Sequence, residues 1–335
     1  MTIRAHGLCS RRRFLRICAA SAALGIVRPM AAASEPATST WRGMAFGGLA
    51  SIELHHSDHG RVRRVLPMVM AEIERLEGIM SLYREDSALM QLNRQGHLGA
   101  APADLVSVLS RARALGDLSQ GCFDVCVQPL WQVYADHFSA PHPDPAGPPP
   151  DLVRRRAESV DYQSLEVDAS AVRLARPGMA VTLNGIAQGY ITDRIVDLLK
   201  NEGFEHVLAD LGELRPLGKA GVNQPWRAVI KNPLFGRGDG IEIELGNQAL
   251  ATSGSYGFRF DAAGRFHHLF DPRSGTCPQR YASVSVLAPD ATTADALATA
   301  CNLMPPESIE GLLRAAGATR AIIIMPDGAV TTIDA

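Results

Sequence analysis

The sequence predicts an α+β protein with mixed, mostly antiparallel sheets and flanking helices. Apolar residues recur at helical spacing over residues 62–83, whereas residues 282–287 alternate in the way typical of a strand. Several short strand-like runs follow one another in pairs, and the helical segments are separate from them. This order favours α+β over a doubly wound α/β sheet, in which single strands and helices alternate.

The elements can be assigned in chain order. We expect a first strand over residues 41–55, bent at Gly47 and Gly48, and then an amphipathic helix over 62–83. Pro67 fits a helix only in its first turn, so this helix is expected to begin close to Pro67. Further helices are expected over 103–119, 190–201 and 307–316, and further strands over 206–214, 228–233, 241–245, 248–251, 320–325 and 329–333.

Residues 137–151 are Pro-rich and have no hydrophobic periodicity. Such a segment is typical of a surface loop, and we expect it to be a connection within the fold.

The first 33 residues are typical of an export signal. Residues 10–16 read SRRRFLR, which matches the twin-arginine pattern, and the apolar run 17–27 that follows is too short to anchor stably in a bilayer. Residues 31–33 offer an A-x-A cleavage site. We therefore expect a twin-arginine signal peptide over 1–33, one domain over 34–335, a periplasmic location and no stable membrane anchor in the mature form.

Composition excludes one class of partner. Removing residues 1–33 would take away six of the 33 basic residues and none of the 35 acidic ones, leaving a formal net charge of −8. With no basic stripe, this chain is not expected to bind nucleic acid. The four cysteines outside residues 1–33 lack the spacing of a zinc site, and we expect them to act as small buried hydrophobes more than as a disulfide framework.

The stretch 252–300 carries an unusual concentration of polar chemistry. The pair His267 and His268 precedes the turn 271–275, DPRSG, and a helix is expected to begin near Thr292, a candidate N-cap. On that helix Asp295 and Thr299 are four residues apart and share one face. A carboxylate and a hydroxyl at this spacing suit Mg²⁺ or Ca²⁺ better than zinc or copper.

A second stretch, residues 180–189, is expected to run from a strand into a glycine-rich turn. Asn184 and Gly185 can adopt positive φ there, which lets the backbone approach a ligand closely. The helix that follows would present its N-terminus to a phosphate.

Four segments combine these features in a fixed order: TLNGIAQGYITD, TSGSY, HLFDPRSG and DALAT. They resemble the ApbE family, the FAD:protein FMN transferases, whose pattern is roughly DLGGIAKGY…D, TSGDY, HIIDPRTG and DALAT. Weaker matches extend the resemblance over most of residues 41–335. The chain departs from the family at Thr182, where Asp is common, at Gln188, where Lys is common, and at Leu211, where Gly is common.

The resemblance implies an ApbE-like fold and a set of site residues. The carbonyl of Gly185 would complete a metal site with Asp295 and Thr299, and Asp295 and His268 would be catalytic. His268 would contact the flavin phosphate or assist proton removal from the incoming hydroxyl. Residues implied in binding the nucleotide are Phe46, Tyr83, Cys122, Phe123, Asp124, Thr182, Gln188 and His268.

The activity implied is Mg²⁺-dependent transfer of FMN from FAD to a threonine or serine hydroxyl of a flavoprotein, with release of AMP. The acceptor would be a protein with a periplasmic FMN domain. Two alternatives stay open: a flavin-binding accessory without turnover, similar to the NosX group associated with nitrous-oxide respiration, and an FAD pyrophosphatase.

Overall fold

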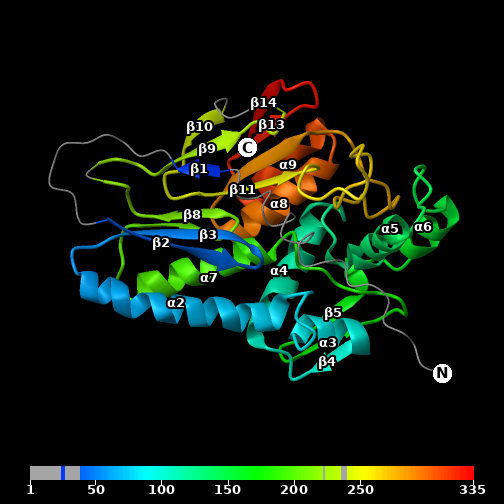
Figure 1. Cartoon of the computed structure of the whole chain (residues 1–335), viewed down its shortest axis with the longest axis horizontal. Coiled ribbons are helices and arrows are strands. Elements are labelled where there is room, and N and C mark those ends of the chain that lie inside the picture. The colour runs from blue at the N-terminus through cyan, green and yellow to red at the C-terminus, as the bar shows by residue number, and fades with distance from the viewer. Residues whose placement is uncertain (1–23, 27–37, 222, 235–239) are drawn as a thin grey trace.

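A computed structural model describes residues 24–26, 38–221, 223–234 and 240–335. Its centre is an eight-stranded sheet, with helices packed on one face and a small sheet on the other (Figure 1). Every pairing between the described strands is antiparallel. Across the large sheet the strands are β14 (Val330–Asp334), β13 (Arg320–Ile324), β12 (Ser283–Ala288), β11 (Ala249–Gly254), β8 (Leu214–Leu217), β7 (Val207–Asp210), β3 (Gly48–His55) and β2 (Thr38–Ala45).

The helices lie mainly on one side of this sheet. Helix α7 packs against both α2 and α8, and α8 in turn lies on β11 and β12. The helices are α2 (His59–Met80), α3 (Ala88–Gln95), α4 (Ala103–Leu118), α5 (Gln128–Ser139), α6 (Pro150–Ala157), α7 (Ala187–Asn201), α8 (Ala291–Leu303) and α9 (Pro306–Ala316).

Two smaller sheets complete the fold. One has the order β1 (Leu24–Ile26), β9 (Arg227–Lys231) and β10 (Gly240–Glu244), and the other the order β4 (His97–Gly99), β6 (Ala171–Leu174) and β5 (Leu165–Val167). The rest of the expected signal peptide, residues 1–23 and 27–33, lies outside the described residues.

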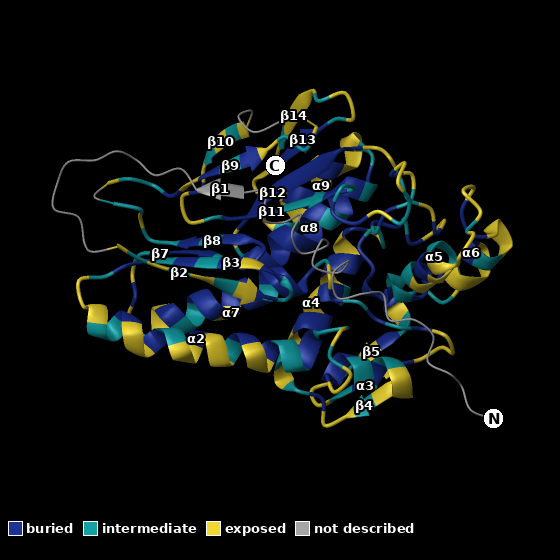
Figure 2. Cartoon of the chain, in the orientation of Figure 1, coloured by how far each residue is buried: buried dark blue, intermediate teal, exposed yellow. Residues whose placement is uncertain are grey.

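The layers explain which strands are buried on both faces. One apolar core fills the space between the large sheet and helices α2, α4, α7, α8 and α9, and a second lies between the large sheet and β9 and β10. Strand β12 sits between these two cores, and all six of its residues are buried (Figure 2). A third cluster, largely aromatic, joins α5 and α6 to Phe270 at one end of the molecule.

The predicted strand over 41–55 is in fact a hairpin. Strands β2 and β3 pair from Thr38 opposite His55 to Ala45 opposite Gly48. The turn places Phe46 and Gly47 at positive φ, 49° and 75°. The alternating pattern continues through this turn, which is why it resembles one strand bent at two glycines.

The expectation for Pro67 was wrong. Helix α2 begins at His59, capped by the Asp58 side chain, which accepts a hydrogen bond from the Arg61 amide at 3.0 Å. Pro67 lies inside the helix on its exposed face, where water can satisfy the carbonyl group that a proline leaves without a donor. The loop expected over 137–151 is shorter, because α5 continues to Ser139 and α6 begins at Pro150.

Helices α7 and α8 approach each other unusually closely. A Cβ atom built on Gly189 would lie 2.2 Å from the carbonyl oxygen of Ala291. Thr292 is not the N-cap of α8: Asp290 is, and it accepts from the Thr293 amide at 2.7 Å. The Thr292 hydroxyl instead donates to Asp193 on α7 at 2.5 Å, so it helps to join the two helices.

Within the described residues, none of the helices is both long and apolar enough to cross a membrane.

We predict that Gly189→Ala lowers the free energy of unfolding by about 2–3 kcal/mol, because the added methyl group overpacks a contact between two backbones. Gly311→Ala is the matched control, since its helical site on α9 is open and nothing lies within 4 Å of the new Cβ. The free energy of unfolding of this control should rise by about 0.5–1 kcal/mol, because alanine favours a helix more than glycine does. Urea denaturation of both variants measures the difference, and an unchanged midpoint for Gly189→Ala would contradict the close packing.

Candidate active site

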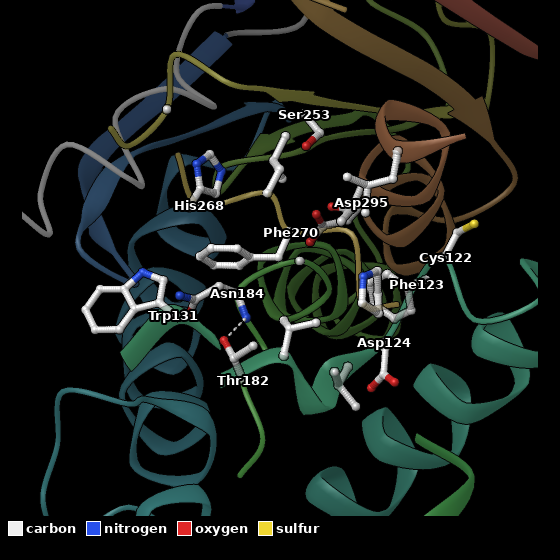
Figure 3. A pocket seen from close by; sticks show the side chains of 18 of the residues that line it. Cys122, Phe123, Asp124, Trp131, Thr182, Asn184, Ser253, His268, Phe270 and Asp295 are labelled. Atoms are coloured by element: carbon white, nitrogen blue, oxygen red, sulfur yellow. Dashed lines mark hydrogen bonds between the residues drawn. The ribbon is translucent and has the colours of Figure 1, made fainter. Parts of the chain in front are cut away.

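The floor of the candidate site is the buried face of α8. Asp295 and Thr299 are one turn apart on this helix, and both line a cavity beside α7. The Asp295 side chain points toward the cavity (Figure 3). Only 7% of Asp295 is exposed, so its carboxylate lies deep in the fold.

The turn before α7 brings Gly185 to the same place. A Cβ built on Gly185 would lie 3.1 Å from Oγ1 of Thr299, so the glycine backbone nearly touches the hydroxyl. The amide of Gly189 donates to Oδ2 of Asp295 at 3.0 Å. The fold therefore brings together the three residues that the sequence suggested as metal ligands.

The backbone before and within this turn differs from the prediction. Neither Asn184 nor Gly185 has positive φ, and residues 180–183 form no strand. Glycine fits at 185 because an added Cβ would crowd Oγ1 of Thr299 at 3.1 Å and touch the ring of Phe123 at 3.4 Å. Close approach, not an unusual backbone conformation, explains this residue.

Buried carboxyl groups gather at the floor. The pKa of Asp295 is raised to about 7, mainly by burial and in part by the nearby Asp193, although the hydrogen bond from Gly189 opposes the shift. Burial also raises the pKa of Glu213 well above its usual value, with Asp295 adding to the effect. A cation bound at the floor would favour the ionised form of Asp295.

Oxygen donors of the kind preferred by Mg²⁺ and Ca²⁺ are the ones present. Asp295 offers a carboxylate, Thr299 a hydroxyl and Gly185 a backbone carbonyl, and all three are hard ligands. In the described part of the chain, no group of three or more histidine, cysteine, aspartate or glutamate side chains is arranged to hold a metal ion. The donor set fits an oxygen-seeking divalent cation better than zinc.

Asp193 holds the two helices in register, a role that the sequence analysis missed. Its carboxylate on α7 accepts from the amides of Ala291 and Thr292 at 2.8 and 2.9 Å, and it is paired with Arg215. These bonds satisfy the first amides of α8 and fix where that helix begins. Asp193 lies within the segment TLNGIAQGYITD, but neither spacing nor composition distinguishes its role from that of a surface carboxylate.

The cavity lining also includes most of the residues expected to bind the nucleotide. Those that line the cavity are Cys122, Phe123, Asp124, Thr182, Gln188 and His268. The Asp124 carboxylate accepts from the amides of Cys126 and Tyr162 at 2.7 and 3.0 Å, which fastens the loop that carries Phe123. Burial raises the pKa of Asp124 to about 6.

Phe46 and Tyr83 have a different placement, since neither belongs to the lining of this cavity. Phe46 lies in the turn of the β2–β3 hairpin, where its amide donates to Oε1 of Glu77 at 2.6 Å. Tyr83 follows α2 and is 42% exposed. Contact of either residue with a nucleotide stays a prediction.

The two adjacent histidines have different environments. His267 is fully buried; its Nδ1 accepts from the Leu269 amide at 3.2 Å, so Nε2 donates to the carbonyl oxygen of Pro278 at 3.0 Å. His268 lines the cavity, and its Nδ1 lies 3.3 Å from both the amide nitrogen and the carbonyl oxygen of Phe258. Burial lowers the pKa of each to about 4, so both rings are neutral at pH 7.

The turn after the histidines is held by its own side chains. Asp271 accepts from the Arg273 amide and the Ser274 hydroxyl, both at 3.0 Å, and Arg273 donates to the carbonyl oxygen of Gln120 at 2.6 Å. All four cysteines in the described residues are free, as expected of small apolar side chains more than of a disulfide framework.

An aromatic part of the cavity lining was not foreseen. Trp131 and Phe270 line the cavity, and Trp131 is in contact with Phe258 and Phe260 at ring-centroid distances of 6.2 and 5.9 Å. Figure 3 shows Trp131 and His268 on one side of the cavity and Cys122 and Phe123 on the other. No sequence pattern indicates this wall, because Trp131 and Phe270 come from segments more than a hundred residues apart.

Fold and site together define an α+β protein whose cavity joins a buried acidic floor, suited to a divalent cation, to an aromatic wall. Residues 46–323 match the family model described as ApbE family. The chain belongs to the ApbE family.

Several relatives have names that describe their activity. The chain is 31% identical to a FAD:protein FMN transferase of Treponema pallidum, covering 79% of this chain and 78% of that protein. It is 33% identical to a FAD:protein FMN transferase of Vibrio cholerae, over 70% of this chain and 72% of that one.

Solved structures agree with the fold. A flavin transferase ApbE from Vibrio cholerae superposes with a TM-score of 0.76 at 26% identity, covering 89% of this chain and 98% of that one. The ApbE protein from Thermotoga maritima gives a TM-score of 0.77 at 25% identity, over 88% and 96% of the two chains. These likenesses confirm the predicted α+β class.

We predict that His267→Gln flattens the loss of stability in acid. The pKa of this histidine is about 4 when folded, against an ordinary value of 6.5. The folded state therefore disfavours its protonation, and the associated stability is complete above pH 6.5 and is lost as the pH falls toward 4. The stability that the neutral His267 contributes above pH 6.5, and that is lost in acid, is about 3 kcal/mol, at 1.36 kcal/mol per pKa unit.

Urea denaturation at a series of pH values checks this prediction. The slope between pH 6.5 and 4 should be shallower for His267→Gln than for the natural protein. His142→Gln is the control, because His142 is exposed on the loop between α5 and α6 and should leave the profile unchanged. Parallel profiles for all three proteins would contradict the assignment of a buried neutral His267.

Proposed function

We propose that this protein is a FAD:protein FMN transferase, which moves FMN from FAD to a threonine or serine hydroxyl of an acceptor protein. The observation that carries the proposal is the convergence of Asp295, Thr299 and Gly185 in one cavity lined by neutral and aromatic groups. Membership of the ApbE family and the names of the relatives from Treponema pallidum and Vibrio cholerae support it.

The reaction needs one bond to break and one to form. The acceptor oxygen attacks the phosphorus of the FMN half of FAD, a phosphoester bond forms, and the pyrophosphate P–O bond to AMP breaks. The hydroxyl proton leaves the acceptor, and AMP departs with the bridging oxygen. Because phosphoryl transfer depends on positioning and on neutralising charge, few protein groups are required.

A divalent cation, Mg²⁺ or Ca²⁺, would be held by Asp295, Thr299 and the Gly185 carbonyl. When bound it would supply neutralisation of the pyrophosphate charge. The buried Asp295 carboxylate has a pKa raised to about 7, so cation binding would favour its charged form. Gly189 keeps this carboxylate in place through its amide, and Asp193 fixes the start of the same helix.

His268 is the candidate base for the acceptor hydroxyl. In the tautomer whose Nδ1–H donates to the carbonyl oxygen of Phe258 at 3.3 Å, Nε2 is the nitrogen that can take a proton. In the other tautomer Nδ1 accepts from the Phe258 amide, and Nε2 carries the hydrogen. Burial keeps the pKa of this ring at about 4, so the ring is neutral at pH 7 and can accept.

Two of the three departures from the family pattern lie in the cavity itself, and Leu211 lies outside its lining. Thr182 and Gln188 both line it, where the family commonly has a carboxylate and an ammonium group. The two replacements remove one charge of each sign, so the local net charge is preserved. Gln188 retains hydrogen-bond donors for an oxygen but lacks the point charge of lysine.

The proposed acceptor and compartment depend on the first 33 residues. We infer that residues 1–33 are a twin-arginine signal peptide, that residues 34–335 form the transferase domain, and that the mature protein acts in the periplasm. Its acceptor would then be a flavoprotein with a periplasmic FMN domain, and the NosX-like pattern of the leader is consistent with this.

Incubation with FAD, Mg²⁺ and such an acceptor domain tests the activity. Mass spectrometry should detect FMN added to the acceptor, together with AMP. Release of FMN and AMP without an acceptor would identify a pyrophosphatase instead. Tight FAD binding with no AMP released, even with an acceptor, would identify an accessory protein.

Asp295→Asn should lower the rate of FMN transfer by about 100-fold or more, a loss typical of removing one group that stabilises charge in the transition state. Chelation of divalent cations with EDTA should abolish activity in the natural protein, and added Mg²⁺ should restore it there but not in the variant. Undiminished transfer by Asp295→Asn would overturn the metal assignment.

A matched pair at position 299 separates the hydroxyl from the shape of the side chain. Thr299→Ser keeps the hydroxyl and should retain most activity, whereas Thr299→Val keeps the volume and should raise the Mg²⁺ concentration needed for half-maximal rate. Equal Mg²⁺ requirements for the two variants would argue that the hydroxyl is not a ligand.

Replacing Arg11 and Arg12 together by lysine should retain the protein in the cytoplasm, because twin-arginine recognition distinguishes arginine from lysine. Fractionation of cells measures the distribution. Arg16→Lys is the control and should be exported normally. Periplasmic protein from the double variant would contradict the twin-arginine route.

A further inference from the structure

The outer face of helix α2 carries a group of exposed apolar side chains. The inner face of this helix packs into the main core, and its outer face is turned to solvent along one side of the molecule (Figure 2). In the middle of the outer face Pro67, Met68, Met70 and Ala71 are exposed, Met68 by 45% and Met70 by 53%. A cluster of exposed apolar side chains on one element is typical of an interaction surface.

Charged residues of opposite sign flank this apolar group. Arg63, Pro67, Met70 and Glu74 follow one another at steps of three or four residues, so they lie along one line of the helix surface. All four are exposed. This line, which we call the α2 stripe, is therefore basic at its N-terminal end, apolar in the middle and acidic at its C-terminal end.

The two charges of the α2 stripe form no ion pair within the described residues. The adjacent Arg75 differs, because it is paired with Glu72 at 2.7 Å. Arg63 and Glu74 are separated by about 17 Å along the helix axis, at 1.5 Å per residue, which is too far for them to pair with each other. Each charge is thus available to a partner outside the chain.

We propose that a second copy of this chain covers the α2 stripe, with its own α2 packed antiparallel about a twofold axis that passes near Met68. In this arrangement Arg63 of each copy faces Glu74 of the other. Pro67 of each copy faces Met70 of the other, so the exposed apolar groups bury one another.

The order of the residues on the stripe favours a second copy over other partners. A twofold interface must be complementary to itself, because each surface patch meets the same patch reversed. Reversing a basic, apolar and acidic order gives an acidic, apolar and basic one, so opposite charges meet at both ends. An anionic membrane would attract Arg63 but repel Glu74. A contact along one helix is small for a specific interface, and we expect a weak dimer.

The dimer leaves both candidate active sites open. None of the residues that line the cavity belongs to α2, which is described throughout. The inference is therefore independent of the proposed function, and FMN transfer should proceed at the same rate per site in monomer and dimer.

Sedimentation velocity of the full chain at about 1–300 μM tests the proposal, because a weak dimer forms over this range. The natural protein should shift from monomer toward dimer as its concentration rises. Arg63→Glu and Glu74→Arg each place like charges across the axis twice per dimer, and each should raise the Kd about tenfold or more. Arg155→Glu, at an exposed position of α6, is the control and should dimerise normally.

Mixing the two single variants separates this contact from general damage to the fold. In an equimolar mixture of Arg63→Glu and Glu74→Arg, each glutamate of one chain faces an arginine of the other. The mixture should therefore recover the dimer, and so should the double variant that carries both changes. Unfolding midpoints establish that all variants are folded.

Each of three results would overturn the proposal. The first is a natural protein that stays monomeric up to about 300 μM. The second is a dimer that neither single variant weakens, and the third is a weakened dimer that the mixture does not recover. Binding of a monomer to phosphatidylglycerol vesicles, lost in Arg63→Glu, would assign the stripe to a membrane instead. Absence of FMN transfer in a protein that dimerises would count against the proposed function alone.

Discussion

The close contact between α7 and α8 is the constraint on which the site depends. Gly189 lets the two backbones meet, and its amide then reaches Oδ2 of Asp295. Asp193, one turn further along α7, binds the first amides of α8. The same pair of helices is thus joined at two levels by carboxylates that accept backbone hydrogen bonds. Because α8 is also packed on β11 and β12, the position of Asp295 is set by the core and not by a loop.

The packing of α8 buries carboxyl groups at the floor, and their burial is electrostatically unfavourable. Burying Asp295 and Glu213 close together is unfavourable, and the raised pKa of each reports that cost. The fold tolerates the arrangement because the floor opens onto a cavity that can receive a cation. Trp131 and Phe270 add aromatic side chains to the same cavity. A ligand that carries a large aromatic ring, and negative charge that a cation held at the floor would neutralise, matches this lining, and FAD is such a molecule.

Much of this organisation could be predicted from the sequence, for identifiable reasons. The strands of the second half and helices α4 and α9 follow hydrophobic periodicity, which is a local property. The spacing of four residues predicts that Asp295 and Thr299 share a helix face. Only the resemblance to the ApbE family adds Gly185 to this pair. The prediction of positive φ at Asn184 and Gly185 was wrong. A glycine in a turn can be needed either for positive φ or for close packing, and the sequence does not say which. The structure shows close packing, because Thr299 lies against Gly185.

Other features depend on tertiary contacts that no local pattern encodes. Asp290 and Thr292 are both acceptable helix caps by residue type, and the position of Asp193 decides between them. Pro67 was expected near a helix start, but solvent exposure of that face permits it eight residues into α2. The position of Trp131 in the cavity lining depends on contacts with Phe258 and Phe260, which lie more than 120 residues away. Such residues become visible only when the chain is folded.

The burial of helix α8 limits which substitutions the fold can accept. Its small side chains, Ala294, Ala296, Ala298 and Ala300, are buried, so a larger residue at these places would displace Asp295 and Thr299 on the same helix. The segment from α5 to α6, in contrast, is joined to the rest of the molecule through a cluster rich in aromatic rings, and much of α6 is exposed. The exposed face of α6 can therefore accept larger side chains that α8 cannot.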